Sequence, residues 1–230
     1  MRNGCKLSST SLKSKFGRSS TDPKDNLQVC FDLSLDRLPE TDRTLYHALG
    51  IFPENTPILD AVIARLWKHI GSQLSDFDCG ELLTELARLE LIERHPDKTV
   101  TMHDLLHDYM RGNLGDGLKN THRELLRAYN SVAKSWWEMP DDGYIFENLV
   151  YHLFEAGFGE EAFELLTGAK HWQVEKSKIK GFSAFVDDIQ LAIEKAKLLP
   201  VADYYPVCRR PQALSGNVPP KREQNERYKD

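Results

Sequence analysis

From about position 59 to position 196, the sequence repeats apolar residues three and four positions apart. This spacing places one apolar stripe along each α-helix, and such stripes are stable only when they pack against one another. A mostly α-helical fold is therefore predicted. The clearest faces in the first half are Leu59, Val62, Ile63, Leu66, Trp67 and Ile70, then Leu82, Leu83, Leu86 and Leu89.

The helical spacing stops at one place, within "LELIERHPDKTVTM". Two short β-capable runs, Leu89–Arg94 and Thr99–Met102, flank the turn-forming sequence His-Pro-Asp-Lys. Such a pattern is typical of a β-hairpin. Helices followed by a small hairpin predict a winged-helix domain over residues 40–117, with residues 27–39 as the end of a preceding helical subdomain.

After Gly117 the helical pattern returns and continues to residue 199. Pro140 and the following Asp-Asp-Gly are expected to end one helix, and Gly157 to mark a turn between two others. We predict an antiparallel helical bundle or helical-repeat domain over residues 118–199. Its expected buried faces are Leu125, Leu126, Tyr129, Val132, Ala133, Trp136 and Trp137; Ile145, Phe146, Leu149, Val150, Leu153 and Phe154; and Phe182, Phe185, Val186, Ile189, Ala192, Ile193 and Ala196.

The distribution of charge separates the two ends from the middle. The net charge is −5, but residues 26–205 carry 18 basic and 30 acidic side chains, whereas both ends are basic. Residues 1–26 and 200–230 are predicted to be disordered tails. The chain has no apolar run of membrane-spanning length and its four cysteines follow no pairing pattern, which favours a cytoplasmic protein. The Ser/Lys/Arg-rich N-terminus leaves an organelle transit peptide as the alternative.

The stretch "TVTMHDLLHDYMR", residues 99–111, contains the candidate site. On a helical wheel His103 and His107 share one flank of the apolar stripe, as two zinc ligands four positions apart would. A zinc site needs further ligands, and no cysteine or glutamate at suitable spacing supplies them. We therefore expect no metal.

Thr101 and Asp104 resemble a capping box, in which Thr101 is the N-cap and Asp104 lies against the positive end of the helix dipole. His103 would then occupy the first helical turn, where unpaired backbone N–H groups favour an anion. An imidazole at that position can donate a hydrogen bond to a phosphate. A half-buried histidine with a local hydrogen bond is the alternative interpretation.

Several of these segments, in this order, resemble the second half of the NB-ARC module. They are "LQVCFDLSLDRLPETDRTLYHALGIFPENTPI", Leu66–Trp67, "LTELARLELIER" and "TMHDLLHDYMR", so the resemblance runs from Leu27 to Arg111. NB-ARC modules belong to signal-transducing NTPases, including the apoptotic-protease-activating-factor type and plant immune receptors. Residues 118–199 resemble the helical segment that follows the winged helix in some members.

The resemblance implies an ADP-sensing, autoinhibitory switch in defence or cell-death-like signalling. In the family the winged helix closes over ADP held by a nucleotide-binding domain, and the histidine of a Met-His-Asp triplet contacts the β-phosphate. Carried over, His103 is that histidine and Met102 and Asp104 flank it, with Thr101 in a structural role. Loss of the contact would release the winged helix, a population shift set by nucleotide state.

The sequence lacks the phosphate-binding loop of the family, GxxxxGK[ST]. The nearest string, "GNLGDGLKN", has Leu118 in place of the lysine. We therefore expect a fragment or degenerate member that does not bind ADP or ATP by itself and does not hydrolyse ATP. Its partner would be a nucleotide-binding domain in the same or another chain. Alternative partners are a second copy of this chain and a parent receptor.

A DNA-binding winged helix is the alternative function. The candidate recognition helix, "FDCGELLTELARLE", opposes it with one arginine against four acidic residues. Contact with DNA phosphates requires the opposite sign of charge. A hydrolase or metalloenzyme is disfavoured because the spacing assembles no nucleophile–base pair or ligand set.

Overall fold

The computed structural model describes residues 23–71, 74–168 and 170–198. It divides into two compact units, Met1–Val132 and Ala133–Asp230, which are described separately. Most of the predicted tails, residues 1–22 and 199–230, lies outside the described residues. The first described helix begins at Pro23, so residues 23–26 are helical although we predicted them to be part of the tail.

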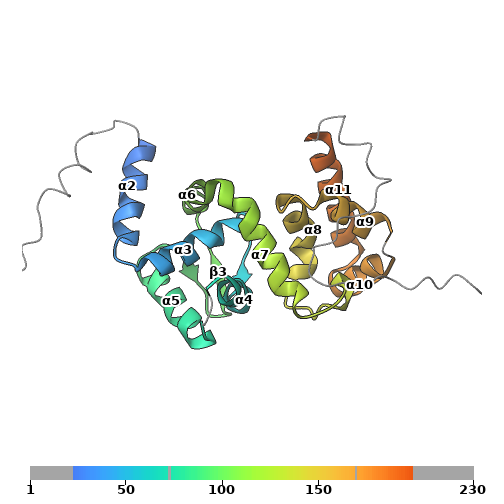
Figure 1. The fold of residues 1–230 in the computed structure, drawn as a ribbon, viewed down its shortest axis with the longest axis horizontal. Helices are drawn as coiled ribbons and strands as arrows, with labels where there is room; N and C mark the ends of the chain where they lie inside the picture. Colours follow the sequence, from blue (N-terminus) through green and yellow to red (C-terminus); the bar gives the residue numbers. More distant parts are fainter. Residues whose placement is uncertain (1–22, 72–73, 169, 199–230) are drawn as a thin grey trace, which may run out of the picture. The chain divides into compact units, whose positions relative to one another are not determined.

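The first unit alternates helices with very short strands (Figure 1). Its elements are α2 (Pro23–Leu35), α3 (Glu40–Ala48), the 3-10 turn η1 (Leu49–Ile51), β1 (Ile58–Leu59), α4 (Asp60–Ile70), α5 (Asp76–Arg88), β2 (Glu93–Arg94), β3 (Thr99–Thr101), α6 (Asp104–Leu114), the 3-10 turn η2 (Gly115–Gly117) and α7 (Leu118–Asn130). The predicted combination of a mostly helical fold with a small antiparallel sheet is confirmed.

The sheet has the strand order β1-β3-β2, with both pairs antiparallel. Val100, in the central strand, is fully buried and pairs with Ile58 on one side and Arg94 on the other. β2 is shorter than predicted because Leu89 and Glu90 end α5. Glu90 adopts a positive φ of 58°, and the N–H of Leu91 bonds to the carbonyl of Leu86 at 3.0 Å. Glycine usually marks such a helix end, and because position 90 is a glutamate this end was not predicted.

Gly50 lets η1 pack directly on α6. A Cβ atom at this position would lie 2.9 Å from both Met110 Cβ and the backbone nitrogen of Arg111. Real Cβ atoms do not approach other atoms so closely, so any side chain would displace α6. The glycine therefore fixes the position of the helix whose first turn contains the candidate site.

We expect Gly50→Ala to lower the free energy of unfolding by about 1–3 kcal/mol, because overpacking must be relieved by backbone movement. Urea unfolding followed by circular dichroism measures this loss. Gly80→Ala is the matched control, since Gly80 lies inside α5 with nothing within 4 Å of its would-be Cβ. It should gain about 0.5–1 kcal/mol from helix propensity. Equal effects of the two substitutions would contradict the packing argument.

The described residues of the second unit form the 3-10 turn η3 (Trp136–Glu138) and the helices α8 (Ile145–Glu155), α9 (Gly159–Thr167), α10 (Lys170–Lys180) and α11 (Phe182–Leu198). Its core contains a stacked pair of rings, Phe146 of α8 and Trp172 of α10, with centroids 5.3 Å apart. Gly157 has a φ of 77° and forms the predicted turn between α8 and α9.

Two predicted helical faces are wrong in part. α7 ends at Asn130, so Val132, Ala133, Trp136 and Trp137 do not continue its face. On α11, Phe185 and Ala192 are buried as predicted, but Phe182, Ile189 and Ile193 are exposed. The buried face of α11 instead includes Asp188, whose carboxylate pairs with the buried Lys176 of α10 at 2.5 Å.

Among the described residues, every helix is too short or too polar to cross a lipid bilayer. Of the four cysteines, Cys30 and Cys79 lie in the described part of the chain and both carry free thiols.

Candidate functional site

His103 lies at the junction between the central strand and α6. β3 ends at Thr101, Met102 is nearly buried, and α6 begins at Asp104, so His103 is the N-cap residue of the helix. Its backbone is extended, with φ −66° and ψ 143°, as is usual at this position. The side chain is 69% exposed. The strand and the helix thus present an accessible imidazole at a fixed point.

The predicted capping role of Thr101 is wrong. Thr101 belongs to β3, where it pairs with Glu93, and its hydroxyl is 2.9 Å from Nε2 of His95. Strand pairing therefore holds Thr101 two residues before the N-cap position of the helix. His103 occupies the N-cap position instead, and Asp104 is the first helical residue rather than the fourth position of a capping box.

Nδ1 of His103 and Oδ1 of Asp104 are 2.5 Å apart. A contact this short between a ring nitrogen and a carboxylate requires a proton on Nδ1, because both atoms are otherwise acceptors. The N–H of Leu105 is 3.3 Å from the same Nδ1 and only 2.8 Å from Oδ1 of Asp104. The carboxylate is thus the better acceptor for Leu105, which leaves Nδ1 to donate its proton to Asp104.

Three backbone N–H groups at the start of α6 are already paired, which differs from our expectation of an open anion site. Leu105 donates to Asp104 Oδ1, while Leu106 and His107 donate to the carbonyl of His103 at 2.9 and 3.0 Å. An incoming phosphate would therefore meet the imidazole rather than a row of amides. Within the described part of the chain, Nε2 of His103 has no hydrogen-bond partner, and it can donate to a phosphate when the ring carries both protons.

The second histidine of the motif points into the protein. His107 is 3% exposed, and its Nε2 lies 2.8 Å from the carbonyl oxygen of Phe52. The zinc-like pairing of His103 and His107, considered from the sequence, is not formed, because one ring caps the helix and the other is buried. The sequence pattern placed both rings on one flank and did not reveal the partner 55 residues earlier in the chain.

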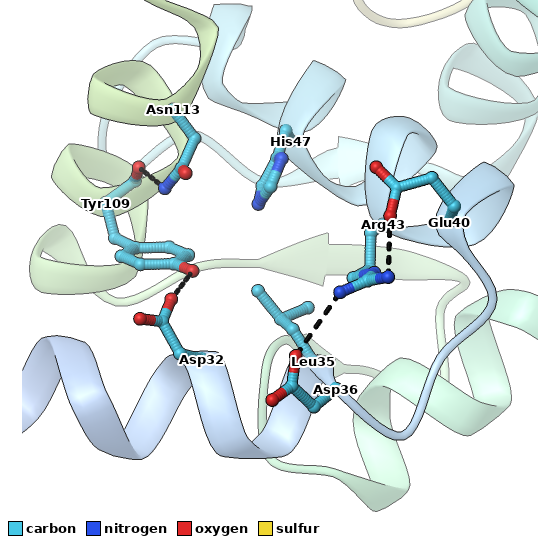
Figure 2. Close-up of a pocket in the computed structure, with 8 residues that line it drawn as sticks. All are labelled: Asp32, Leu35, Asp36, Glu40, Arg43, His47, Tyr109 and Asn113. Carbon is cyan, nitrogen blue, oxygen red and sulfur yellow. Dashed lines mark hydrogen bonds and ion pairs between the residues drawn. The ribbon is translucent and has the colours of Figure 1, made fainter. Parts of the chain in front are cut away.

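A pocket lies near α6 but away from His103. It measures about 250 Å³ and is formed by α2, α3 and α6 (Figure 2). Tyr109 donates to Asp32 at 2.5 Å, and burial, reinforced by this carboxylate, raises the pKa of Tyr109. Three carboxylates and one arginine make the pocket unsuited to a diphosphate. Its lining residues are Asp32, Leu35, Asp36, Glu40, Arg43, His47, Tyr109 and Asn113.

The contacts in this pocket hold α2 against the rest of the unit. Figure 2 shows Asp32 of α2 directed toward Tyr109, and Asp36, the residue after α2 ends, directed toward Arg43 at 3.3 Å. Burial also lowers the pKa of His47, so this ring is neutral at pH 7. The pocket is best explained as a helix junction, and the exposed His103–Asp104 pair remains the candidate site.

Residues 118–200 match the family model of the APAF-1 helical domain. This part of the chain is an APAF-1-like helical region. No curated protein matches the chain. The matched residues begin with α7, directly after the helix that carries His103 and the short turn η2, so the region follows the candidate site in the sequence.

Proposed function

We propose that this chain is the regulatory winged-helix and helical portion of an NB-ARC-type, nucleotide-dependent signalling switch. In this proposal His103 senses the β-phosphate of ADP held by a nucleotide-binding domain, in the same chain or in another. The chain itself performs no catalysis. The family match over residues 118–200 supports the signalling class, and the exposed imidazole at the start of α6 carries the sensing role.

The order of elements in the first unit supports a winged helix. α3, β1, α4, α5, β2 and β3 follow one another as helix, strand, helix, helix and hairpin. The strand from between the helices, β1, pairs with the second hairpin strand to give the order β1-β3-β2. This order supports the proposed winged helix, in which the β2–β3 turn would be the wing.

The geometry of His103 and Asp104 suits recognition of a phosphate. Because Nδ1 lies against Asp104, Nε2 is the ring nitrogen left to face a phosphate, and it is a charged donor whenever the ring carries both protons. Asp104 thus acts as a positioning residue, and the N-cap conformation holds both groups at the helix start. One imidazole is a small part of a nucleotide site, so we expect the chain alone to hold ADP weakly.

The test joins this chain to a phosphate-binding-loop domain of the NB-ARC type and measures the rate of ADP release with a fluorescent analogue. We expect His103→Ala to accelerate release by about 5- to 150-fold, the range of a coupling free energy of 1–3 kcal/mol. Unchanged release would contradict the phosphate contact.

Two further variants separate the phosphate contact from helix capping. Aspartate and asparagine both cap helices well, so His103→Asp and His103→Asn preserve the start of α6. If the contact is electrostatic, His103→Asp should release ADP faster than His103→Ala, and His103→Asn should be intermediate. If His103 only caps the helix, Asp and Asn variants should retain ADP like the parent protein.

We do not favour DNA binding, because the surface of α5 is acidic. Asp42, Asp78, Glu81 and Glu85 line a groove beside this helix. Hydrogen bonds from Ser75 lower the pKa of Asp78. The guanidinium of Arg88 forms an ion pair with the carboxylate of Glu85 at 2.6 Å. The chain should therefore pass through a duplex-DNA column without retention even at low ionic strength. Salt-sensitive retention would favour the DNA-binding alternative.

A further inference from the structure

We propose that Glu54, His107 and Asp108 form a binding site for a divalent transition-metal ion, with Zn²⁺ as the expected occupant. The three side chains come from two places, the loop after η1 and the second turn of α6. One ligand atom from each lies within 4.8 Å of the other two. The site does not include His103, and the inference goes beyond the proposed nucleotide-sensing function.

The buried ring of His107 is the observation that points to a ligand. Its Nε2 must be the donor in the 2.8 Å bond to Phe52, because a carbonyl oxygen can only accept. The other nitrogen, Nδ1, is buried and has no hydrogen-bond partner. It lies 3.4 Å from Oε1 of Glu54, which is beyond the range of an ordinary N–H···O bond.

When the His107 ring is neutral, the lone pair of Nδ1 faces carboxylate oxygens, an arrangement that a metal cation between them would complete. The hydrogen bond from Nε2–H to a backbone carbonyl is the usual support of a metal-binding histidine, since it fixes the ring and the tautomer. Nitrogen and carboxylate oxygen ligands suit Zn²⁺ at about 2.0–2.2 Å. Ligand atoms around a tetrahedral zinc ion lie about 3.5 Å apart. The exposed side chains of Glu54 and Asp108 would therefore rotate slightly toward the ion when it binds.

Three protein ligands leave a fourth position for water, as in open zinc sites. The imidazole disfavours Mg²⁺ and Ca²⁺, which prefer oxygen ligands alone. A bound ion would join the Phe52–Pro57 loop to α6 and neutralise the two carboxylates beside the start of that helix. The expected consequence is a higher melting temperature in the presence of Zn²⁺.

The test titrates the full chain, stripped of metal with a chelator, with ZnCl₂ in an isothermal calorimeter in the presence of excess MgCl₂. The double variant Glu54→Gln/Asp108→Asn should lose at least about tenfold in affinity, a loss that even an outer-shell change commonly causes. Both residues are exposed, so the fold should persist, which circular dichroism checks. Asp116→Asn, an exposed acid in η2, is the matched control.

All cysteines and the other histidines are the same in these proteins, so a difference in affinity isolates the proposed site. Nitrogen-15 NMR of the His107 ring provides the second readout. Zn²⁺ should shift Nδ1 while Nε2 stays protonated. Equal affinity of parent and double variant would overturn the proposal. The proposal would also be overturned if both ring nitrogens of His107 were protonated and their chemical shifts did not change on addition of Zn²⁺. That result would show a simple imidazolium–carboxylate pair.

Discussion

Lys176→Met should lower the free energy of unfolding of the second unit by about 3–5 kcal/mol at pH 8. Lys176 and Asp188 are each at least 95% buried, and their charged atoms are 2.5 Å apart between α10 and α11. Removing the ammonium group leaves a carboxylate without its counter-ion inside the helical core. Urea unfolding followed by tryptophan fluorescence measures the loss, since Trp136, Trp137 and Trp172 all lie in this unit.

The size of this effect should depend on pH. Burial raises the pKa of Asp188 to about 6 in spite of the lowering effect of Lys176. Without Lys176 the pKa should rise further. A carboxyl whose pKa is higher in the folded state than in the unfolded state binds more protons when folded, so its contribution to stability falls as the pH rises. The destabilisation by Lys176→Met should therefore be smaller at pH 5 than at pH 8.

Two controls make this prediction specific to the buried pair. Lys178, two residues after Lys176 on α10, is exposed and pairs with Glu175. Lys178→Met should therefore change stability by less than about 0.5 kcal/mol. The double variant Lys176→Met/Asp188→Leu removes both charges and should recover most of the lost stability. A double variant as unstable as Lys176→Met alone would show that packing, not the unpaired charge, causes the loss.

The sequence predicted best those elements whose partners are also apolar. The spacing of Phe146, Leu149 and Leu153 predicted a buried face of α8, and all three are fully buried. The β2–β3 hairpin was predicted from its turn residues, which carry their own backbone geometry. In both cases the information is local, because periodicity and turn chemistry need no knowledge of distant residues.

The sequence failed where a polar group is buried by a partner far along the chain. Asp188 was missed because a carboxylate on an apolar face becomes stable only through Lys176, a residue of another helix. His107 was placed on a flank because its acceptor, the carbonyl of Phe52, cannot be read from residues 99–111. Thr101 was assigned to a helix cap because its pairing with Glu93 is also non-local.

The sequence predicted which residues form the candidate site better than it predicted how those residues contact each other. The motif selected His103 and Asp104, and the structure brings them within 2.5 Å of each other at the start of a helix. Their mode of contact was not predicted, because it depends on where the helix begins. A shift of the N-cap from Thr101 to His103 turns Asp104 from a capping residue into the partner of the imidazole. An error of two residues in a boundary thus changes the chemistry of the site.

Trp67→Ala should lower the free energy of unfolding of the first unit by about 3–5 kcal/mol. Trp67 is fully buried in α4, and its Nε1 donates to the carbonyl oxygen of Leu45 in α3 at 2.8 Å. The substitution removes the largest side chain of this core and the hydrogen bond that joins the two helices. Thermal unfolding should show the loss as a marked fall in the melting temperature.

Trp67→Phe separates the two contributions, because it keeps an aromatic ring but removes the N–H donor. It should cost less than Trp67→Ala, with the lost hydrogen bond contributing about 1 kcal/mol. Phe77→Ala is the control, since Phe77 of α5 is 73% exposed and its removal should change stability by less than about 0.5 kcal/mol. A similar loss of stability from Phe77→Ala would contradict the exposed position of that ring. A small loss from Trp67→Ala would contradict the buried position of Trp67.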